Sequence, residues 1–425
     1  MKKILESFKI KSDYFNLLKN NPDFHKLMWA VILSQIGTQM HRFGLPWLVY
    51  DISGSAALMA VNFTVSLIPG FIFGLLGGIV SDRYSRKFIL ISGDILAFLV
   101  ISVFLLLYLL SMPIGVLSLF ILTFALSTLS ALSTPSFDAA VPKLVSNKEI
   151  VDANGLFNVS RSFISLGGPV FAGVIIGFFG PWSNILLNGL SFLFSAILII
   201  FIRRDINSDM KSTKESVLEN ISQGANYVRQ HIWLTHGIVI IFGVFLATGS
   251  VGSLIQFYLR EGLNLEGFMF GFSFTLFEFL PMLVMGIYAP TLAKKYNYES
   301  LIVVGSIAFS LSLVGLGATT IYPVVIGFGM LLNGSAVLII ISWNSMRQER
   351  VPNNLLGRVS GVAFTLQSTA LPIGGAISSF LVNFISAQFT FIIFGAICLA
   401  ISIYIIFTPF LNNDYLRLNK VNQET

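Results

Sequence analysis

The sequence predicts an all-α integral membrane protein with twelve transmembrane helices in two pseudo-symmetric halves of six. Three observations lead to this prediction: the composition, the length of the apolar stretches and the placement of the charges. Of the 425 residues, 55% are hydrophobic and only 11% are charged, and the mean hydropathy is +0.82. Soluble domains have about 45–50% apolar residues, so the composition excludes an ordinary soluble chain.

Twelve stretches of the sequence approach the length of roughly 20 apolar residues that a helix needs to cross a bilayer. The short segments between them hold most of the charged residues. In chain order the predicted spans are 27–50, 55–80, 88–110, 113–138, 154–180, 182–202, 233–259, 265–290, 300–318, 323–346, 357–384 and 388–410.

The Lys and Arg residues lie almost entirely on one side of these spans. Both termini and every second loop are basic, whereas the loops on the other side contain only Arg260, and Arg42 and Arg161 lie within spans. Short cytoplasmic loops are enriched in Lys and Arg, so we expect a multi-pass protein of the cell membrane with both termini in the cytoplasm. This placement explains the net charge of +6 without a nucleic acid as partner.

The longest polar stretch inside the chain separates six spans from six. The expected parts are an N-terminal cytoplasmic segment, a six-helix half, a cytoplasmic linker, a second six-helix half and a cytoplasmic tail, at 1–26, 27–202, 203–230, 231–410 and 411–425. Within the linker, 215–230 is expected to form an amphipathic helix on the membrane surface. Short sequence echoes, such as 168–169 and 371–372, recur across the linker. Duplicated halves are typical of transporters, which expose a central site alternately to each side.

A charged segment follows the second span and carries the clearest motif. Residues 78–87 have the pattern Gly-x-x-x-Asp-Arg-x-x-Arg-Lys, and further motifs lie at 135–145 and 168–173. Together they resemble the major facilitator superfamily, in particular its macrolide-efflux and enterobactin-exporter-like branch. The resemblance covers roughly residues 20–410 and implies the major facilitator fold and export of a drug-like compound. Ser85 stands where the family pattern has Gly.

The resemblance implies that the charged segment is part of a gate. Asp82 is expected to accept hydrogen bonds at the N-terminus of a neighbouring helix, where the helix dipole favours an anion. The family resemblance implies that this neighbour is the eleventh transmembrane helix. The neighbouring cations would pair with acids or lipid phosphates, with Asp138 as a candidate partner, or would only set the orientation. Gly70, Gly74 and Gly78 would allow close helix approach. The expected gating residues are Gly78, Asp82, Arg83, Arg86, Lys87, Asp138, Gly168 and Pro169.

Ionisable residues inside spans are the main candidates for a transport site, because each costs about 2.5–3.5 kcal/mol at the bilayer centre. Glu278 lies near the middle of the eighth span. Burial disfavours its charged form and a nearby cation favours it, so Glu278 is the candidate proton carrier, the alternative being a structural hydrogen bond. Arg42 or Arg161 could be its counter-ion, although Arg161 could also extend to the interface. Asp94 is expected to support the charged segment, and His41 to be a packed hydrogen bonder.

Polar residues inside the spans complete the expected substrate site. Gln35, Gln39 and Arg42 follow an i, i+4, i+7 spacing and share one helix face. The candidate substrate-binding residues are Gln35, Gln39, Arg42, Asn158, Arg161, Glu278, Asn333, Asn344 and Gln367. Three aromatic residues are weaker candidates for lining an apolar pocket: Phe274, Phe277 and Trp343.

The sequence therefore predicts a monomeric secondary transporter that exports a small amphipathic or hydrophobic compound in exchange for protons, with no cofactor or metal. The fourth span lacks the buried Arg of many proton-coupled antiporters, so an uncoupled facilitator stays open, as do a siderophore or metabolite exporter and a lipid flippase. A remote alternative is an intramembrane enzyme, because Asp51 and Asp94 resemble paired protease aspartates. Ile91 stands where that motif needs Gly, and one Cys and four scattered His form no zinc or thiol motif.

Overall fold

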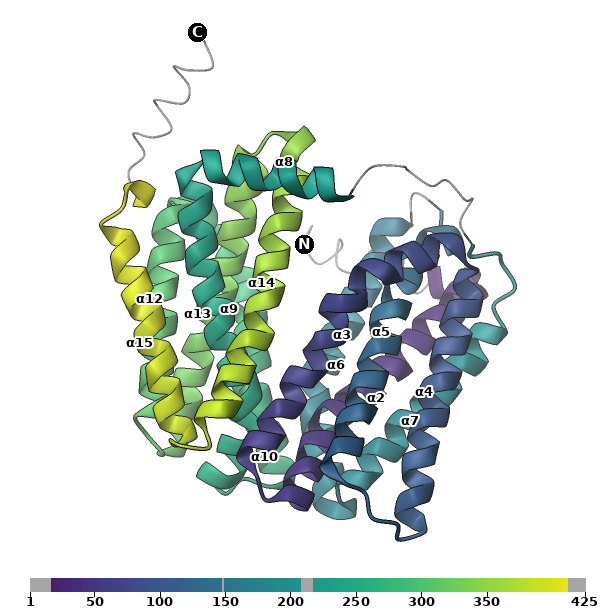
Figure 1. Cartoon of the computed structure of the whole chain (residues 1–425). Helices are drawn as coiled ribbons and strands as arrows, with labels where there is room; N and C mark the ends of the chain where they lie inside the picture. The colour runs from purple at the N-terminus through teal and green to yellow at the C-terminus, as the bar shows by residue number, and fades with distance from the viewer. Residues whose placement is uncertain (1–16, 147–148, 208–216, 412–425) are drawn as a thin grey trace, which may run out of the picture. The chain divides into compact units, whose positions relative to one another are not determined.

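The computed structural model describes residues 17–146, 149–207 and 217–411, which form long helices joined by short connections and contain no strand. The first half of the chain contains α2 (Pro22–Ser53), α3 (Ala56–Arg83), α4 (Arg86–Leu109), α5 (Val116–Leu144), α6 (Ile150–Phe179) and α7 (Pro181–Ile200). The second half contains α8 (Val217–Gln230), α9 (Ile232–Phe257), η1 (Tyr258–Gly262), α10 (Gly267–Phe274), η2 (Thr275–Phe279), α11 (Leu280–Lys295), α12 (Tyr298–Gly317), α13 (Tyr322–Arg350), α14 (Asn353–Leu381), α15 (Ala387–Ile406) and η3 (Pro409–Leu411) (Figure 1).

Each predicted span coincides with a helix or a continuous run of helices. Among the described residues, 10 of these are long and apolar enough to cross a membrane. The predicted first and eleventh spans correspond to α2 and α14, which have 32 and 29 residues but a more polar composition. The prediction of an all-α membrane fold is confirmed, with ten spans that meet the apolar criterion and two polar helices in the remaining positions.

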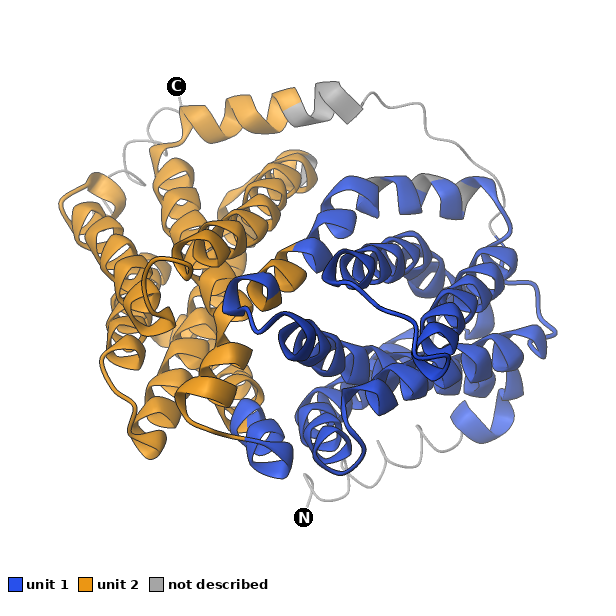
Figure 2. Ribbon diagram, turned by 60° about the horizontal axis from the view of Figure 1, so that its bottom comes forward, with its two compact units in different colours: residues 1–58, 65–213, 266–275 blue, residues 59–64, 214–265, 276–425 orange. Residues whose placement is uncertain are grey.

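The chain divides into two compact units, which Figure 2 colours separately. Unit 1 comprises residues 1–58, 65–213 and 266–275, and unit 2 comprises 59–64, 214–265 and 276–425. In unit 1, α2 packs against α6 and α7, α4 against α5 and α7, and α10 against α6. In unit 2, α12 packs against α13 and α15, α9 against α14 and α15, and α11 against α13. The domain boundaries expected from the sequence remain a prediction.

Two apolar clusters form the core of unit 1. One joins the start of α4 to the ends of α5 and α7 and includes Leu90 and Leu144. The other joins the middle of α4 to α2 and α5 and includes Ala97 and Leu122. Asp94 lies on α4 between Leu90 and Ala97, on the same buried face, so a carboxyl group separates the two clusters along this helix.

The ends of α2 and the start of α3 follow local sequence signals. Asn21 caps α2, accepting a hydrogen bond from the Phe24 N–H, and Pro22 occupies the first helical position, where its missing N–H costs nothing. α2 ends at Gly54, which has a φ of 61° in the left-handed region that glycine adopts readily. Ser55 then caps α3.

Ser85 explains how the chain departs from the family pattern at the start of α4. Its hydroxyl accepts a hydrogen bond from the Phe88 N–H at 3.3 Å, and its φ is −59°. This backbone conformation does not require glycine, and the serine side chain satisfies one of the free N–H groups of the helix N-terminus.

Replacing Ser85 by Ala should lower the free energy of unfolding by about 1 kcal/mol, because an N-terminal N–H group loses its acceptor. Ser85→Gly, which restores the family residue, should cost only a few tenths of a kcal/mol. Thermal unfolding of the purified protein in detergent measures both changes. A loss of equal size in the two variants would contradict a capping role for the hydroxyl.

The linker helix expected at 215–230 is present as α8, which begins at Val217; the two preceding residues lie outside the described part of the chain. α8 packs against α14. Gln223 accepts a hydrogen bond from Arg358, and a Cβ at Gly224 would lie 2.5 Å from the Arg358 carbonyl oxygen. Within unit 2, α8 is therefore held against the first turns of α14.

Candidate functional site

The charged segment 78–87 forms the end of α3, a short turn and the start of α4. At its centre, the Arg86 guanidinium is buried and donates hydrogen bonds to two carbonyl oxygens, those of Ala139 at 3.0 Å and Ile206 at 3.3 Å. Arg86 therefore joins α4 to α5 and to the segment after α7, and it does so through backbone acceptors.

Lys87 makes the same kind of contact one residue later. Its Nζ donates to the carbonyl oxygens of Ile200 at 2.9 Å and Ile202 at 2.6 Å, at the C-terminal end of α7, where the helix dipole favours a cation. From the sequence, these cations are expected to pair with acids or lipid phosphates, whereas in the structure the partners of Arg86 and Lys87 are carbonyl groups. Arg83 is exposed. The side chain of Asp82 lies outside the described part of the chain, so its gating role remains a prediction.

Asp138, the expected acidic partner of these cations, instead forms an ion pair with Arg161, with 3.7 Å between Oδ1 and Nη2. The two side chains line a cavity of about 170 Å³ together with Asn154 and Asn158. The structure thus brings one predicted gating residue and two predicted substrate-binding residues to one place. The Arg161 side chain is 48% exposed and the Asp138 side chain is 66% exposed. Exposed ion pairs contribute only about 0–1 kcal/mol, so both groups can readily exchange partners.

The glycine pattern of α3 does not serve the close approach that its spacing predicted. Among the described residues, no atom lies within 4 Å of the position of a Cβ at Gly70, Gly74 or Gly78. A Cβ at Gly77 would instead lie 2.5 Å from the carbonyl oxygen of Ala131. Gly77 is therefore the residue that lets α3 approach α5, one position along from the predicted face.

The Gly168–Pro169 pair lies where α6 contacts two other helices of unit 1. A Cβ at Gly168 would lie 2.9 Å from Cγ of Gln39 on α2, and a Cβ at Gly271 on α10 would lie 2.1 Å from the Pro169 carbonyl oxygen. The pair thus allows close packing of α6 on both sides. A gating role is consistent with this position and remains a prediction.

The predicted polar stripe on α2 is half-buried. Oε1 of Gln39, packed against α6, is buried without a hydrogen-bond partner among the described residues. The Arg42 guanidinium lies 5.9 Å from the ring centroid of Phe43 and 5.8 Å from that of Phe274, distances at which a cation is attracted to a ring face. Gln35 lies one turn before Gln39 on the same helix.

Glu278 lies in a π-helical turn, η2, and is half-buried between two buried phenylalanines. Single π-helical turns are frequent at functional sites. Asn333 on α13 supports this turn, because its Nδ2 donates to the Phe277 carbonyl at 2.9 Å and to the Gly329 carbonyl at 3.2 Å. The amide that was expected to bind substrate therefore holds the backbone beside Glu278.

Other predicted residues of unit 2 have structural contacts. The Asn344 side chain accepts a hydrogen bond from Arg347, and Gln367 is half-buried on α14. Trp343, expected as a possible pocket residue, is 1% exposed, and its ring covers Gly237, where a Cβ would lie 2.2 Å from it. Trp343 thus belongs to the core.

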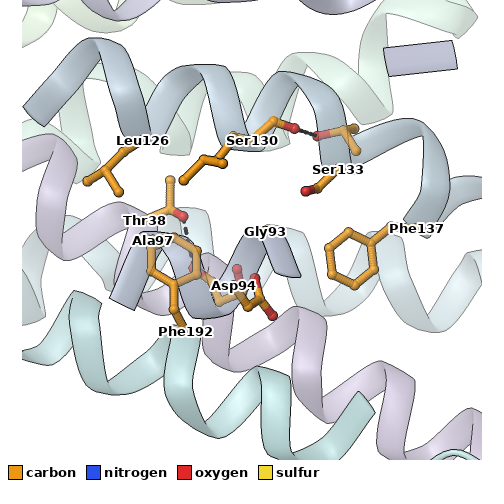
Figure 3. Close-up of a pocket in the computed structure, with 12 residues that line it drawn as sticks. Thr38, Gly93, Asp94, Ala97, Leu126, Ser130, Ser133, Phe137 and Phe192 are labelled. Atoms are coloured by element: carbon orange, nitrogen blue, oxygen red, sulfur yellow. Dashed lines mark hydrogen bonds between the residues drawn. The ribbon is translucent and has the colours of Figure 1, made fainter. Parts of the chain in front are cut away.

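A cavity around Asp94 was not predicted from the sequence. Asp94, Ser130, Ser133, Phe137 and Phe192 line it together with residues of α2, and its volume is about 50 Å³. In the view of Figure 3, Asp94 lies between the two phenylalanine rings and across from the two serines. A polar residue on the buried face of an apolar helix was the available signal, but the sequence does not show which helices surround it.

Comparisons with known proteins agree with this architecture. The family model of the transmembrane secretion effectors, a group within the major facilitator superfamily, matches residues 18–422. Macrolide efflux protein A of Streptococcus pyogenes is 21% identical over 388 residues, which cover 89% of this chain and 94% of that protein. An uncharacterized MFS-type transporter of Bacillus subtilis, YfiS, is 23% identical over 91% of this chain and 93% of its own length.

Solved transporter structures share the fold at low sequence identity. The nucleoside transporter NupG superposes with a TM-score of 0.73 at 11% identity, covering 90% of this chain and 99% of that chain. A bacterial homologue of the iron transporter ferroportin in an inward-facing state gives 0.69 at 17% identity, covering 90% and 98%. Because the family model spans nearly the whole chain, the protein is a membrane transporter of the transmembrane secretion effector family, within the major facilitator superfamily.

Proposed function

We propose that this transporter exports a small amphipathic or hydrophobic compound by alternating access, in exchange for protons, as a monomer in the bacterial cytoplasmic membrane with both termini in the cytoplasm. The observation that carries the proposal is Glu278, an ionisable residue in a π-helical turn in the middle of an apolar span. Such a residue is costly in a membrane and is expected to have a function.

The chemistry of exchange follows from the two states of this carboxyl group. When Glu278 is ionised it can hold a cationic or hydrogen-bonding substrate, and when it is protonated it loses the charge that holds the substrate. A proton taken up from outside would thereby release the substrate, and loss of that proton to the cytoplasm would restore the site. Asn333 keeps the turn in place by its bond to the Phe277 carbonyl.

The substrate class is suggested by the relatives. Two relatives match this chain over most of their own length. One is a macrolide efflux protein, and the other is an uncharacterized MFS-type transporter. At 21–23% identity they support a drug-like substrate without defining it. A siderophore or metabolite exporter, an uncoupled facilitator and a lipid flippase remain the alternatives, and a macrolide such as erythromycin is the first compound to test.

Glu278→Gln should abolish proton-coupled export. In everted membrane vesicles, adding erythromycin to the wild-type protein should release protons from the acidified lumen, measured as recovery of a quenched pH dye. The Gln variant should show no such release, because its amide cannot exchange a proton. Glu266→Gln, which changes an acid just before α10, is the matched control and should keep the wild-type response.

The same vesicles separate coupling from transport itself. If Glu278→Gln keeps full proton release, the carboxyl group is not the proton carrier and this part of the proposal fails. If the wild-type protein only equilibrates erythromycin across the membrane, without any proton movement, the uncoupled facilitator is correct. If it transports no macrolide, a growth screen with dyes, siderophore stress and other antibiotics in an export-deficient host identifies the class.

A further inference from the structure

Asp94 is a buried acid that the proposed exchange mechanism does not use. It is 5% exposed and lies in the third predicted span, on α4 between two apolar clusters. Burial of an ionised carboxylate costs several kcal/mol unless cations or hydrogen-bond donors compensate for it. The surroundings of Asp94 therefore show which form of the acid this site can hold.

In the described part of the chain, no cation pairs with this carboxylate. Apart from Asp94, none of the described residues that line its cavity is charged. The Arg86 guanidinium, on the same helix, is bonded to carbonyl groups, and α7 carries no ionisable residue. On α5, Asp138 is paired with Arg161, while Lys143 lies further along the helix; neither acidic nor basic residues of α5 line the cavity.

Hydroxyl groups surround the carboxyl group instead. Ser195 on α7 lies beside it, and a Cβ at neighbouring Gly93 would lie 2.6 Å from Oγ of Ser133, so α5 is also close. Among the described residues, neither Oδ2 of Asp94 nor Oγ of Ser195 has a hydrogen-bond partner. The carboxyl group thus has one oxygen free to carry a proton. The hydroxyl groups around it can donate hydrogen bonds to the ionised carboxylate or accept one from the protonated acid.

The cavity also has room for water beside the carboxyl group. Thr38, Ser130 and Thr134 line it and are exposed, whereas Asp94 and Ser133 are buried. A volume of about 50 Å³ is enough for a water molecule, which needs at least 10–15 Å³ of such space. Water can therefore reach the carboxyl group along a row of hydroxyls.

Two further cavities of unit 1 share walls with this one. Thr38 and Ser130 also line a cavity of about 250 Å³ that contains His41 of α2, whose Nδ1 is buried without a partner among the described residues. Phe137 is shared with the cavity of the Asp138–Arg161 pair. The two cavities next to that of Asp94 therefore both contain ionisable groups, His41 in one and the Asp138–Arg161 pair in the other.

We propose that Asp94 is a second proton-binding site, which takes up a proton from water in this cavity and returns it there during the transport cycle. The O–H bond forms at the Asp94 carboxylate with a proton delivered by hydronium, and it breaks when the proton returns to water, so no other reactant is needed. The link to the cycle rests on the proposed proton exchange, but proton binding at Asp94 does not depend on the identity of the substrate.

Infrared difference spectroscopy tests the proposal directly. For protein reconstituted in lipid, the spectrum of the wild type minus that of Asp94→Asn should contain one protonated-carboxyl band, and its intensity should fall as the pH is raised. Asp205→Asn, which changes an exposed acid after α7, should retain this band, and so should Glu278→Gln. A difference spectrum without the band, or with a band of constant intensity at every pH, would overturn the proposal.

A second variant removes the dependence on how well Asp94→Asn folds. Ser195→Ala keeps the carboxyl group and removes the hydroxyl beside it, so the midpoint of the titration should shift; a purely structural Asp94 would show no titration to shift.

Repeating the titration in sodium chloride and in choline chloride distinguishes a proton from a sodium ion, whose oxygen ligands this cavity could also supply. A band that disappears with sodium at constant pH would assign the cavity to that ion and contradict the proposal. None of these measurements uses a transported compound, so their outcome is separate from that of the export assay.

Discussion

Arg350→Met should lower the free energy of unfolding by about 3–5 kcal/mol, the usual cost of removing one partner of a buried ion pair. Nη1 of Arg350 lies 2.5 Å from Oε1 of Glu299, and the two side chains are 17% and 7% exposed. The guanidinium also lies 5.6 Å from the ring centroid of Trp233. The substitution would leave a carboxylate buried without its cation.

The position of this pair in unit 2 makes the effect large. Glu299 is in the first turn of α12 and Arg350 is the last residue of α13, so each charge is at the helix end that the dipole favours. Beside it, the Tyr298 hydroxyl donates to the Glu349 carboxylate at 2.7 Å. The pair therefore closes one end of the α12–α13 hairpin and ties it to α9 through Trp233.

Chemical denaturation of the reconstituted protein measures this loss. Arg229→Met, which removes an exposed arginine from α8, is the matched control and should change stability by less than about 0.5 kcal/mol. The double variant Arg350→Met with Glu299→Gln should recover much of the loss, because no charge is then left buried. If the double variant is as unstable as the sum of the single changes, the two residues do not act as a pair.

The sequence predicted the helices well because the membrane imposes a strong length rule. Long apolar runs gave a helix at each expected position, including 323–346 and 388–410. The ends were less accurate, since the span expected at 113–138 continues as a helix to Leu144. Apolar composition marks the part that crosses the bilayer, whereas the helix itself continues until a cap or a turn residue ends it.

The roles of individual polar residues were harder to predict, because they depend on which helices meet. Asn333 was expected in the substrate site, and its amide is bonded to the backbone of a π-helical turn. Asp94 was expected to support the charged segment, and it lines a cavity with hydroxyl groups of other helices. Hydropathy and spacing show that a residue is polar and buried; they do not show which neighbour it meets.

The repeat between the halves is visible in a packing contact. In unit 1, Gly168 on α6 lies against Gln39 on α2, and in unit 2, Gly374 on α14 lies against Leu246 on α9. The helices that carry the sequence echo of 168–169 and 371–372, α6 and α14, therefore each pack a glycine closely, against α2 and α9 respectively. The contacts differ in one respect, because α6 meets a flexible side chain whereas α14 meets a backbone carbonyl.

This difference predicts that the α9–α14 contact tolerates a larger residue less well than the α2–α6 contact at Gly168. A Cβ at Gly374 would lie 1.9 Å from the carbonyl oxygen of Leu246, and a Cβ at Gly249 would lie 2.2 Å from that of Leu371. Backbone atoms of packed helices cannot move aside as a side chain can. Gly374→Ala should therefore force α9 and α14 apart and cost about 3 kcal/mol or more, at the upper end for overpacking.

Gly361→Ala on the same helix provides the control. No atom lies within 4 Å of its Cβ position among the described residues, so the change should stabilise α14 slightly, by up to about 1 kcal/mol, through helix propensity alone. Gly168→Ala should fall between the two, since the Gln39 side chain can shift. Thermal unfolding and the yield of monodisperse protein give this order. If Gly374→Ala and Gly361→Ala are equally stable, α9 and α14 are not held together by direct backbone contact, and the inferred difference between the α9–α14 and α2–α6 contacts is wrong.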